Sequence, residues 1–367
     1  MQTLLQIDLS FSAIKFGILA FVTAFVVAMI VMPPLIRIIY RFKLFDVPDR
    51  RKEHVAPIPT MGGLASVAGM AVGCALWFQF TQNIFTVSFF FSILVLLAIG
   101  MMDDLKNLPA RYKFAIQIAV AVLIAFSGVR ITSFNGLFGI NELPVSAQYT
   151  FTILAVVGIT NAFNLIDGID GLAGGLGFMS LVILGIFLTL SGDANDAIVA
   201  FALGGGLLGF LYYNFNPAKI FMGDTGSLVL GFIVSVLCIK LIQLNTGVKL
   251  PILPHAPVFV LSIVLIPVFD TLRVFALRIW SGRSPFSPDK NHIHHLLTNN
   301  GWNHNVAAKI LCGVHAVVLV VGYFLKSISQ FGGLLVLFAI MLITVLTFQK
   351  LPFSQSAKDI KANPSNN

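Results

Sequence analysis

The chain has 367 residues, of which 57% are hydrophobic and only 10% are charged, and its formal net charge is +8. This apolar content exceeds that of soluble globular domains and predicts a membrane protein. Three cysteines, Cys74, Cys238 and Cys312, stand singly within apolar runs, without the spacing of a disulfide framework or a thiolate metal site. The positive charge is explained by membrane topology, so nucleic acid is not an expected partner.

Eleven apolar runs approach the length of about 20 residues that a helix needs to cross the hydrocarbon core of a bilayer. Backbone groups in lipid must be hydrogen-bonded within their own segment, so each run is expected to be a helix. The predicted fold class is therefore all-α, a polytopic integral membrane protein. The expected spans are 14–36, 61–80, 86–102, 114–131, 148–166, 172–190, 196–213, 226–243, 256–278, 306–325 and 331–349.

Lysine and arginine concentrate in cytoplasmic loops and so set the orientation of a membrane protein. With the N-terminus outside and the C-terminus cytoplasmic, eighteen of the 23 basic residues fall on the inner side. The chain start lacks the basic stretch and cleavage site of a signal peptide, so the first span is expected to remain. We expect a single transmembrane domain over residues 1–353 and a disordered cytoplasmic tail over 354–367.

Acidic residues gather at the cytoplasmic ends of these spans. Asp103 and Asp104 end the third span, and Lys113 follows shortly after them. Adjacent carboxylates beside hydrocarbon repel each other unless a cation lies close. A divalent metal, or pairing with lysines in a solvated loop, would each resolve this repulsion, and both interpretations are retained.

The end of the fifth span carries polar residues every three positions. Asn161, Asn164 and Asp167 then share one helix face, and Gly168 and Asp170 follow them. Tight helix packing through small residues would explain the glycines here but not the polar side chains. Ionisable residues at membrane depth instead favour a functional site.

The segment 216–227 places Asp224 directly after Gly223. The glycine loosens the backbone, and Asp224 with Thr225 before an apolar run is expected to cap the next helix. Phe221 can lie flat on a planar ring, although a lone Phe beside a membrane more often serves packing.

The loop after the ninth span holds three of the seven histidines, His292, His294 and His295. Without a cysteine, their spacing fixes no zinc site. Protonated histidines together with Arg283 can hold phosphate oxygens, and an exposed polar loop is the alternative.

Two further features lie on the same side of the membrane. The first cytoplasmic loop is basic and rich in proline, so an ordered loop that carries Lys52 could close over an anion. Asp270 is expected to pair with Arg273, one helical turn away.

Oxygen ligands for Mg²⁺ combined with cationic side chains are what phosphoryl transfer needs. A transporter, the competing class, would carry its acids near mid-span within inverted repeats, and this sequence shows neither.

Four motifs in order resemble those of the polyprenyl-phosphate N-acetylhexosamine-1-phosphate transferases. They are Asp103-Asp104, the segment 161–171 (NAFNLIDGIDG), the segment 221–227 (FMGDTGS) and the loop 284–295 (SPFSPDKNHIHH). The histidine loop is similar to that of the WecA/TagO-like branch, which transfers GlcNAc-1-phosphate from UDP-GlcNAc to undecaprenyl phosphate. A sister branch transfers phospho-MurNAc-pentapeptide and differs in this loop.

The resemblance implies a role for each group of residues. Mg²⁺, with Mn²⁺ as a substitute, would be held by Asp224 and Asn164. The catalytic carboxylates would be Asp103, Asp104 and Asp167. The nucleotide would contact Asp170, Phe221 and Gly168. The phosphate groups of the donor and the lipid would be held by Lys52, Arg111, Lys113, Arg283, His292, His294 and His295.

The resemblance also implies that residues 1–353 form one catalytic domain in the bacterial cytoplasmic (inner) membrane, with its active site on the cytoplasmic face. The expected partners are UDP-GlcNAc, undecaprenyl phosphate and membrane lipid, with no nucleic acid and with a homodimer as an option. Direct attack by the lipid phosphate is preferred over a covalent intermediate, because that phosphate is already an ionised nucleophile.

Overall fold

The computed structural model describes residues 2–42, 58–215, 217–285 and 291–351, with the backbone alone for residues 2–13. These ranges form α-helices, one short 3₁₀ helix (Leu325–Ser327) and a two-stranded antiparallel sheet. The α-helices are α1 (Gln2–Phe42), α2 (Gly63–Trp77), α3 (Ile84–Lys106), α4 (Ala110–Phe126), α5 (Val145–Ile166), α6 (Leu172–Leu190), α7 (Ala194–Asn214), α8 (Gly223–Asn245), α9 (Ala256–Trp280), α10 (Ile293–Thr298), α11 (His304–Phe324) and α12 (Gln330–Lys350).

Each of the eleven predicted spans coincides with a helix of this bundle. In the described part of the chain, nine helices are long and apolar enough to cross a membrane. The other two, α2 with 15 residues and α4 with 17 residues, are shorter. The prediction of a helical polytopic membrane protein is confirmed, whereas eleven crossings and their orientation stay predictions.

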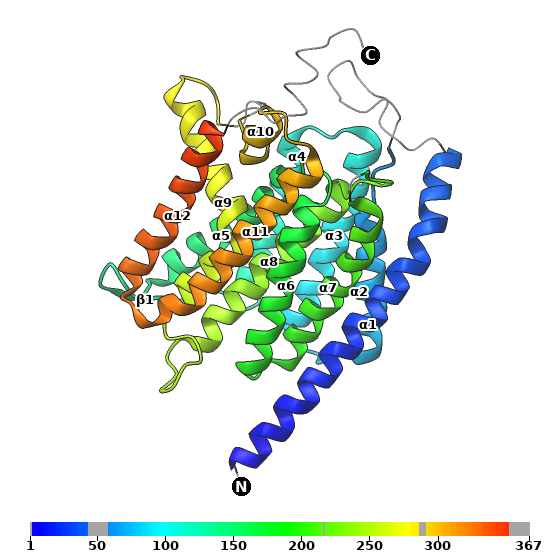
Figure 1. The fold of residues 1–367 in the computed structure, drawn as a ribbon. Helices are drawn as coiled ribbons and strands as arrows, with labels where there is room; N and C mark the ends of the chain where they lie inside the picture. The colour runs from blue at the N-terminus through cyan, green and yellow to red at the C-terminus, as the bar shows by residue number, and fades with distance from the viewer. Residues whose placement is uncertain (1, 43–57, 216, 286–290, 352–367) are drawn as a thin grey trace.

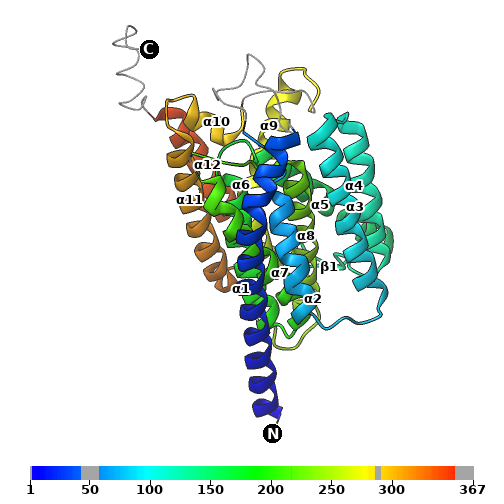
Figure 2. The ribbon, with the colours of Figure 1, turned by 90° about the vertical axis from the view of Figure 1, so that its right-hand side faces the viewer.

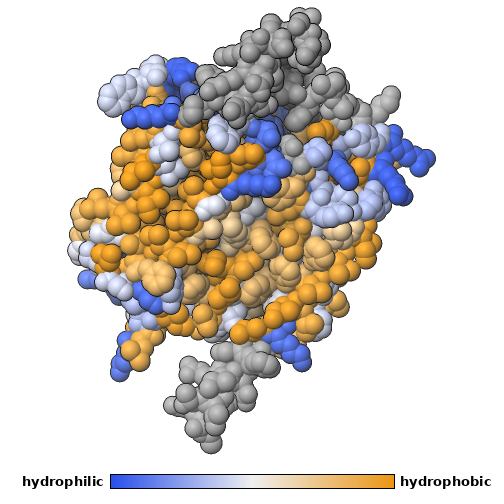
Figure 3. All heavy atoms as spheres, viewed as in Figure 1, coloured by the Kyte–Doolittle hydropathy of each residue, from blue (hydrophilic) through white to orange (hydrophobic). Residues whose placement is uncertain are grey.

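The surface has the character of a protein that lies in lipid. Figure 3 shows apolar side chains in a broad band around the middle of the molecule and polar side chains toward its two ends. Large apolar side chains such as Ile30 and Leu94 are exposed within the long helices. In lipid this exposure carries no hydrophobic cost, because the surroundings are as apolar as the side chains.

Helix α8 lies inside the bundle, with most of its side chains buried, and packs against α3, α5 and α2 (Figures 1 and 2). Glycines permit this close approach at its N-terminal end. A Cβ on Gly63 of α2 would lie 2.1 Å from Gly226 Cα, and one on Gly100 of α3 would lie 2.6 Å from the carbonyl oxygen of Asp224. The first turn of α8 is therefore held tightly between α2 and α3.

The backbone just before α8 is fixed by the segment that precedes α2. The N–H of Phe221 donates to the carbonyl of Pro59 at 2.8 Å, and the N–H of Gly62 donates back to the carbonyl of Phe221 at 2.8 Å. The N–H of Gly63 donates to the carbonyl of Met222 at 3.0 Å. These bonds satisfy backbone groups that would otherwise be orphaned near the membrane.

The sequence analysis did not anticipate a hairpin of β1 (Ser133–Leu137) and β2 (Ile140–Glu142). It lies near the start of α12, at the end of the bundle opposite α10 (Figure 1). The hydroxyl of Thr246 donates to Asn135 Oδ1 at 3.2 Å, which ties the hairpin to the end of α8. The predicted tail 354–367 lies outside the described residues.

Candidate active site

The carboxylate motifs meet at the end of the bundle that carries α10. Asp103 lies in the last turn of α3, Lys113 in the first turns of α4, Asn164 near the end of α5 and Asp224 in the first turn of α8. Helix ends that are far apart in sequence thus place these four side chains in one cluster, which we call the carboxylate site.

Lys113 is the centre of the carboxylate site. Its Nζ donates to Asp103 Oδ2 at 3.1 Å and to Asp224 Oδ2 at 2.8 Å. The three side chains are partly buried, with exposed fractions of 19%, 11% and 20% for Lys113, Asp103 and Asp224. A lysine between two carboxylates offsets their repulsion. The interpretation that both aspartates pair with lysines in a solvated loop holds only for the pairing of Asp103, which lies within α3.

Asp104 plays a different part from its neighbour Asp103. Its two carboxylate oxygens accept hydrogen bonds from the N–H of Asp224 (2.9 Å), the N–H of Thr225 (3.0 Å) and the hydroxyl of Thr225 (2.5 Å). Free N–H groups at the start of a helix need such acceptors. The expectation that Asp224 and Thr225 cap this helix was wrong, because α8 begins at Gly223 and Asp104 of α3 supplies the cap.

Gly223 makes this capping possible. Its φ is +71°, and a Cβ there would lie 2.5 Å from Asp104 Oδ2. Any other residue would be strained in this conformation and would push the carboxylate away. The glycine beside Asp224 therefore has a defined local reason.

Asn164 is fixed against Asp224. Its Nδ2 donates to Asp224 Oδ1 at 2.9 Å and to Ser227 Oγ at 2.9 Å. The amide nitrogen donates to two residues of α8, which leaves Oδ1 as the atom of this side chain that can bind a cation. A carboxylate and an amide oxygen side by side are the donor types that Mg²⁺ prefers.

Asp167 directly follows α5 in an inverse γ-turn. Its φ and ψ are −75° and 53°, and the N–H of Gly168 donates to the carbonyl two residues back at 2.8 Å. Burial, and then the charges of Asp224, Asp104 and Asp170, raise the pKa of Asp167 from 3.8 to about 8. The raised pKa reflects the several carboxyl groups that gather at this end of the bundle.

Of the predicted nucleotide residues, Gly168 and Asp170 directly follow this turn, and Phe221 lies in the segment before α8. Asp170 is buried, with its Oδ2 3.4 Å from the N–H of Ala218 and its Oδ1 3.7 Å from His304 Nδ1. Gly168 is in contact with the histidine loop, because a Cβ there would lie 2.4 Å from His294 Nε2. Phe221 is held through its backbone just before α8.

The three histidines lie at and within α10, where they form a group of rings. The ring of His294 lies 4.2 Å from that of His295 and 5.8 Å, in parallel, from that of His292. Burial lowers the pKa of His294 to about 3, so its imidazole is neutral. The phosphate contact of His294 stays a prediction, and without phosphate this ring is uncharged.

The structure does not bring all predicted cations to the carboxylate site. Arg111 is exposed and turns to Tyr112, whose ring centroid lies 5.0 Å from its guanidinium carbon. Arg283 is exposed in the loop after α9. Lys52 lies outside the described residues. Among the three of these cations that the structure describes, Lys113 is the one that contacts the carboxylates.

Sequence reasoning missed the function of two buried residues. Asn214 accepts from the N–H of Gly171 at 2.8 Å and donates to the carbonyl of Ile220 at 2.9 Å, which joins the ends of α7 and α6 to the segment before α8. Asp270 pairs with Arg273 at 2.9 Å, as expected, but it also contacts the histidine loop. A polar residue at the end of an apolar run was the only sequence signal for either contact.

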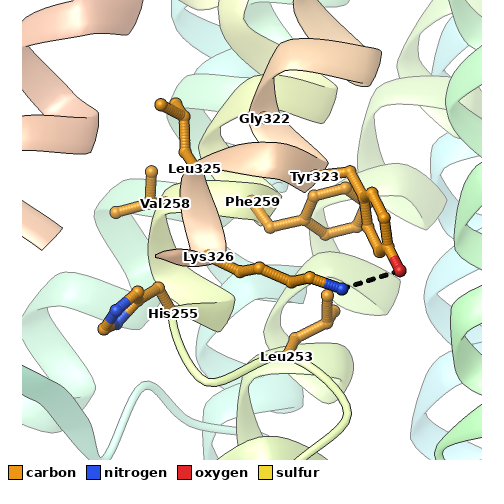
Figure 4. A pocket seen from close by; sticks show the side chains of 8 residues that line it. All are labelled: Leu253, His255, Val258, Phe259, Gly322, Tyr323, Leu325 and Lys326. Carbon is orange, nitrogen blue, oxygen red and sulfur yellow. Dashed lines mark hydrogen bonds between the residues drawn. The ribbon is translucent and has the colours of Figure 1, made fainter. Parts of the chain in front are cut away.

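A shallow depression lies near the N-terminal end of α9, away from the carboxylate site (Figure 4). Lys326 Nζ donates to the hydroxyl of Tyr323 there at 2.8 Å. The remaining lining is mostly apolar and consists of Leu253, His255, Val258, Phe259, Gly322 and Leu325. Because these described lining residues include no carboxylate, the depression does not fit a divalent cation.

Comparisons with known proteins agree with the motifs. The model of glycosyl transferase family 4 matches residues 86–242, which include the C-terminal ends of α3 and α5 and the N-terminal end of α8. A probable undecaprenyl-phosphate N-acetylglucosaminyl 1-phosphate transferase of Bacillus subtilis (strain 168) is 33% identical over 89% of this chain and 89% of its own length.

Two further relatives are similar over most of their length. An undecaprenyl-phosphate alpha-N-acetylglucosaminyl 1-phosphate transferase of Escherichia coli O157:H7 is 32% identical over 83% of this chain and 82% of its own. A decaprenyl-phosphate N-acetylglucosaminephosphotransferase of Mycolicibacterium smegmatis is 34% identical over 74% and 72%. The chain belongs to glycosyl transferase family 4, among the WecA/TagO-like phosphosugar transferases.

Proposed function

We propose that this protein transfers GlcNAc-1-phosphate from UDP-GlcNAc to undecaprenyl phosphate, with release of UMP. The names of its relatives support a polyprenyl-phosphate acceptor and an N-acetylglucosaminyl phosphate group. The observation that carries the proposal is the carboxylate site, where Lys113 bridges Asp103 and Asp224 beside Asn164. A cation between acids at a membrane surface suits a reaction between two phosphates.

The reaction forms one bond and breaks one. An oxygen of the lipid phosphate attacks the β-phosphorus of UDP-GlcNAc, and the bond from that phosphorus to the bridging oxygen breaks as UMP leaves. Both reactants are anions, so the chain must neutralise and align them. Lys113 is the group that contacts phosphate oxygens, because its ammonium already lies between the two acids.

The two adjacent aspartates take separate parts in this proposal. Asp104 positions the start of α8, and with it Asp224, since its oxygens are occupied by the first turn of that helix. Asp103 has Lys113 as its partner and orients that ammonium toward the lipid phosphate. Asp167 lies at the turn next to the donor, and Asp170, Gly168 and Phe221 surround the nucleotide.

The residues present fit Mg²⁺, with Mn²⁺ as a substitute. Within the described ranges no three His, Cys, Asp or Glu side chains form a ready-made metal cage. Mg²⁺ in phosphoryl transfer is commonly held by one or two carboxylates together with substrate phosphates, so such a cage is not required. Asp224 and Asn164 Oδ1 would hold the ion, which would neutralise the diphosphate of the donor.

The distribution of basic residues supports an orientation with the carboxylate site on the cytoplasmic face of the bacterial inner membrane. A nucleotide sugar is soluble in the cytoplasm, and a polyprenyl phosphate presents its head group at the membrane surface. A site at the helix ends is where the two can meet. The phosphates would be gripped from the loop side by His292 and His295, together with Arg283.

The test is release of UMP by purified protein in detergent with UDP-GlcNAc, undecaprenyl phosphate and Mg²⁺. UDP-GalNAc and UDP-MurNAc-pentapeptide run in parallel as donors, and omission of lipid or metal gives the controls. We expect release with UDP-GlcNAc that requires both lipid and metal. Release only with another donor would move the protein to a sister branch, and folded protein that releases no UMP would contradict the proposal.

A further inference from the structure

Asp270 lies on α9 and is not used by the reaction proposed above. Its Oδ2 lies 2.8 Å from His292 Nδ1, and its Oδ1 accepts from the N–H of Ile293 at 2.8 Å and from Arg273 Nη2 at 2.9 Å. The residue is only 1% exposed. A buried carboxylate that accepts three hydrogen bonds is held in one position.

The chemistry of this contact defines the state of the His292 ring. A carboxylate held by an arginine and a backbone N–H is ionised and only accepts hydrogen bonds, so Nδ1 of His292 carries the proton. The ring then keeps Nε2 for another partner. The same carboxylate also caps α10, since His292 precedes this helix and its own side chain makes no cap.

The histidine loop connects Asp270 to the proposed donor site. The ring of His292 is parallel to that of His294, with 5.8 Å between centroids and 5° between planes. His294 in turn contacts the turn at Gly168. A displacement of the loop at Asp270 would therefore be transmitted to the turn that follows α5.

Arg273 secures the same loop a second time. It contacts Asp270 and also donates through Nη2 to the carbonyl of Asn291, the residue before His292. One turn of α9 thus holds the start of the histidine segment at its backbone and at its first ring.

We propose that Asp270 is a positioning residue that acts through His292. It fixes the Nδ1–H proton and the orientation of this ring and holds the loop against the Gly168 turn, so that the ring, when it is protonated at both nitrogens, donates through Nε2 to a phosphate oxygen of the nucleoside diphosphate sugar. The inference rests on the proposed function and assigns it a residue that touches neither substrate nor metal.

A double-mutant cycle separates this role from a structural one. Asp270→Asn keeps the size of the side chain but loses its charge, and His292→Gln removes the ring. The variants Asp270→Asn, His292→Gln and the double variant are compared for KM and kcat with UDP-GlcNAc and with undecaprenyl phosphate. Asp193→Asn is the control, because it removes the charge of an ion-paired carboxylate in the distal part of the bundle, where Asp193 is partly buried and lies 3.3 Å from Lys240 Nζ.

We expect Asp270→Asn to raise KM for UDP-GlcNAc about tenfold, with little change in KM for the lipid, as expected for lost phosphate contacts. In the His292→Gln background the same substitution should change KM by less than about twofold, because its effect passes through the ring. Asp193→Asn should leave both KM values unchanged.

Effects that multiply in the double variant would overturn the proposal, as would a lower Tm for Asp270→Asn with unchanged KM. If Asp270→Asn does not fold, Asp270→Glu, which keeps the charge and displaces the carboxylate, takes its place in the cycle. If the wild type releases no UMP from any donor, the proposed function falls and the role of Asp270 with it. Wild-type activity with independent effects overturns the role of Asp270 alone.

Discussion

Two clusters in this protein share one pattern, a lysine between two aspartates, at opposite ends of α8. In the carboxylate site Lys113 pairs with Asp103 and Asp224. In the second, which we call the distal cluster, Lys240 lies 3.3 Å from Asp193 and 3.2 Å from Asp196. Lys240 follows Asp224 by sixteen positions, which correspond to about 24 Å of helix.

The surroundings of the two clusters differ. In the distal cluster Asp193 also caps α7, and the ammonium of Lys240 also lies 4.8 Å from the centre of the Phe85 ring. These contacts stabilise the local structure. The carboxylate site has additional acids nearby, Asp104 and Asp167, and the turn at Gly168 that follows Asp167 contacts His294 of the histidine loop. An ion pair beside a membrane is therefore no sign of function by itself. The additional carboxyl groups of Asp104 and Asp167, and the histidine loop nearby, distinguish the carboxylate site from the distal cluster.

The largest expected effect is the difference in activity between substitutions of Lys113 and Lys240. Lys113→Met should lower UMP release about 100-fold or more, because it removes the cation that aligns the phosphates. Lys240→Met should leave the rate within about twofold and lower stability by about 1–3 kcal/mol, as expected when a partly buried pair loses one partner. Rates and thermal unfolding of both variants are the measurements. Similar losses of activity would remove the distinction between the clusters.

Substitutions of the adjacent residues Asp103 and Asp104 should also have different effects, one on the rate and the other on stability. Asp103→Asn is expected to lower kcat about tenfold to 100-fold, because it weakens the orientation of Lys113. Asp104→Asn should act on stability, by about 1–2 kcal/mol, because it weakens the cap of α8. Steady-state kinetics and denaturation of the two variants test this. A loss of kcat in Asp104→Asn equal to that in Asp103→Asn, at unchanged stability, would contradict the division of roles.

Glycines with positive φ near each cluster provide a matched pair. Gly223→Ala should destabilise by about 2–3 kcal/mol, since strain at φ +71° is combined with a contact of 2.5 Å to Asp104. Gly192 has φ +88° with nothing within 4 Å of its Cβ position, so Gly192→Ala should cost only about 1 kcal/mol. Thermal denaturation measures both changes. Equal costs would mean that Asp104 moves freely.

The smallest expected effect concerns pH. His294 has a pKa of about 3 in the folded protein against 6.5 for the free side chain. At a pH between about 3 and 6.5, His294 binds a proton in the unfolded chain but not in the folded protein. The free energy of unfolding therefore decreases as the pH falls below about 6.5. Between pH 7.5 and 5, the Tm of wild type should fall more than that of His294→Gln. Parallel curves would contradict the burial of a neutral imidazole.

The sequence was sufficient to predict the helical spans and the residues that share one end of the bundle. Apolar run length reports helices in lipid, and the positions of acids along those runs report which helix ends carry them. The pairings were not predictable, because they join residues distant in the chain. Lys113 and Asp224 are 111 positions apart, Asp104 and Thr225 are 121 apart, and Asp270 and His292 are 22 apart.

Two differences between expectation and structure have clear physical causes. Asp224 was expected to cap α8 because Asp followed by Thr is a common local cap, but an acid from another helix took that place. His294 was expected to be cationic because histidines cluster in a polar loop, but packing of α10 buries it. Local propensity predicts how a segment can behave, and tertiary contacts decide which neighbour satisfies it.

The most direct test of the central claim compares Asp224→Asn with Asp193→Asn in UMP release from UDP-GlcNAc and undecaprenyl phosphate. Both substitutions remove a carboxylate that pairs with a lysine, and they lie at opposite ends of the bundle. We predict that Asp224→Asn loses activity about 100-fold or more while its Tm stays close to that of wild type, and that Asp193→Asn keeps its activity. Full activity in folded Asp224→Asn would contradict the assignment of the carboxylate site as the active site.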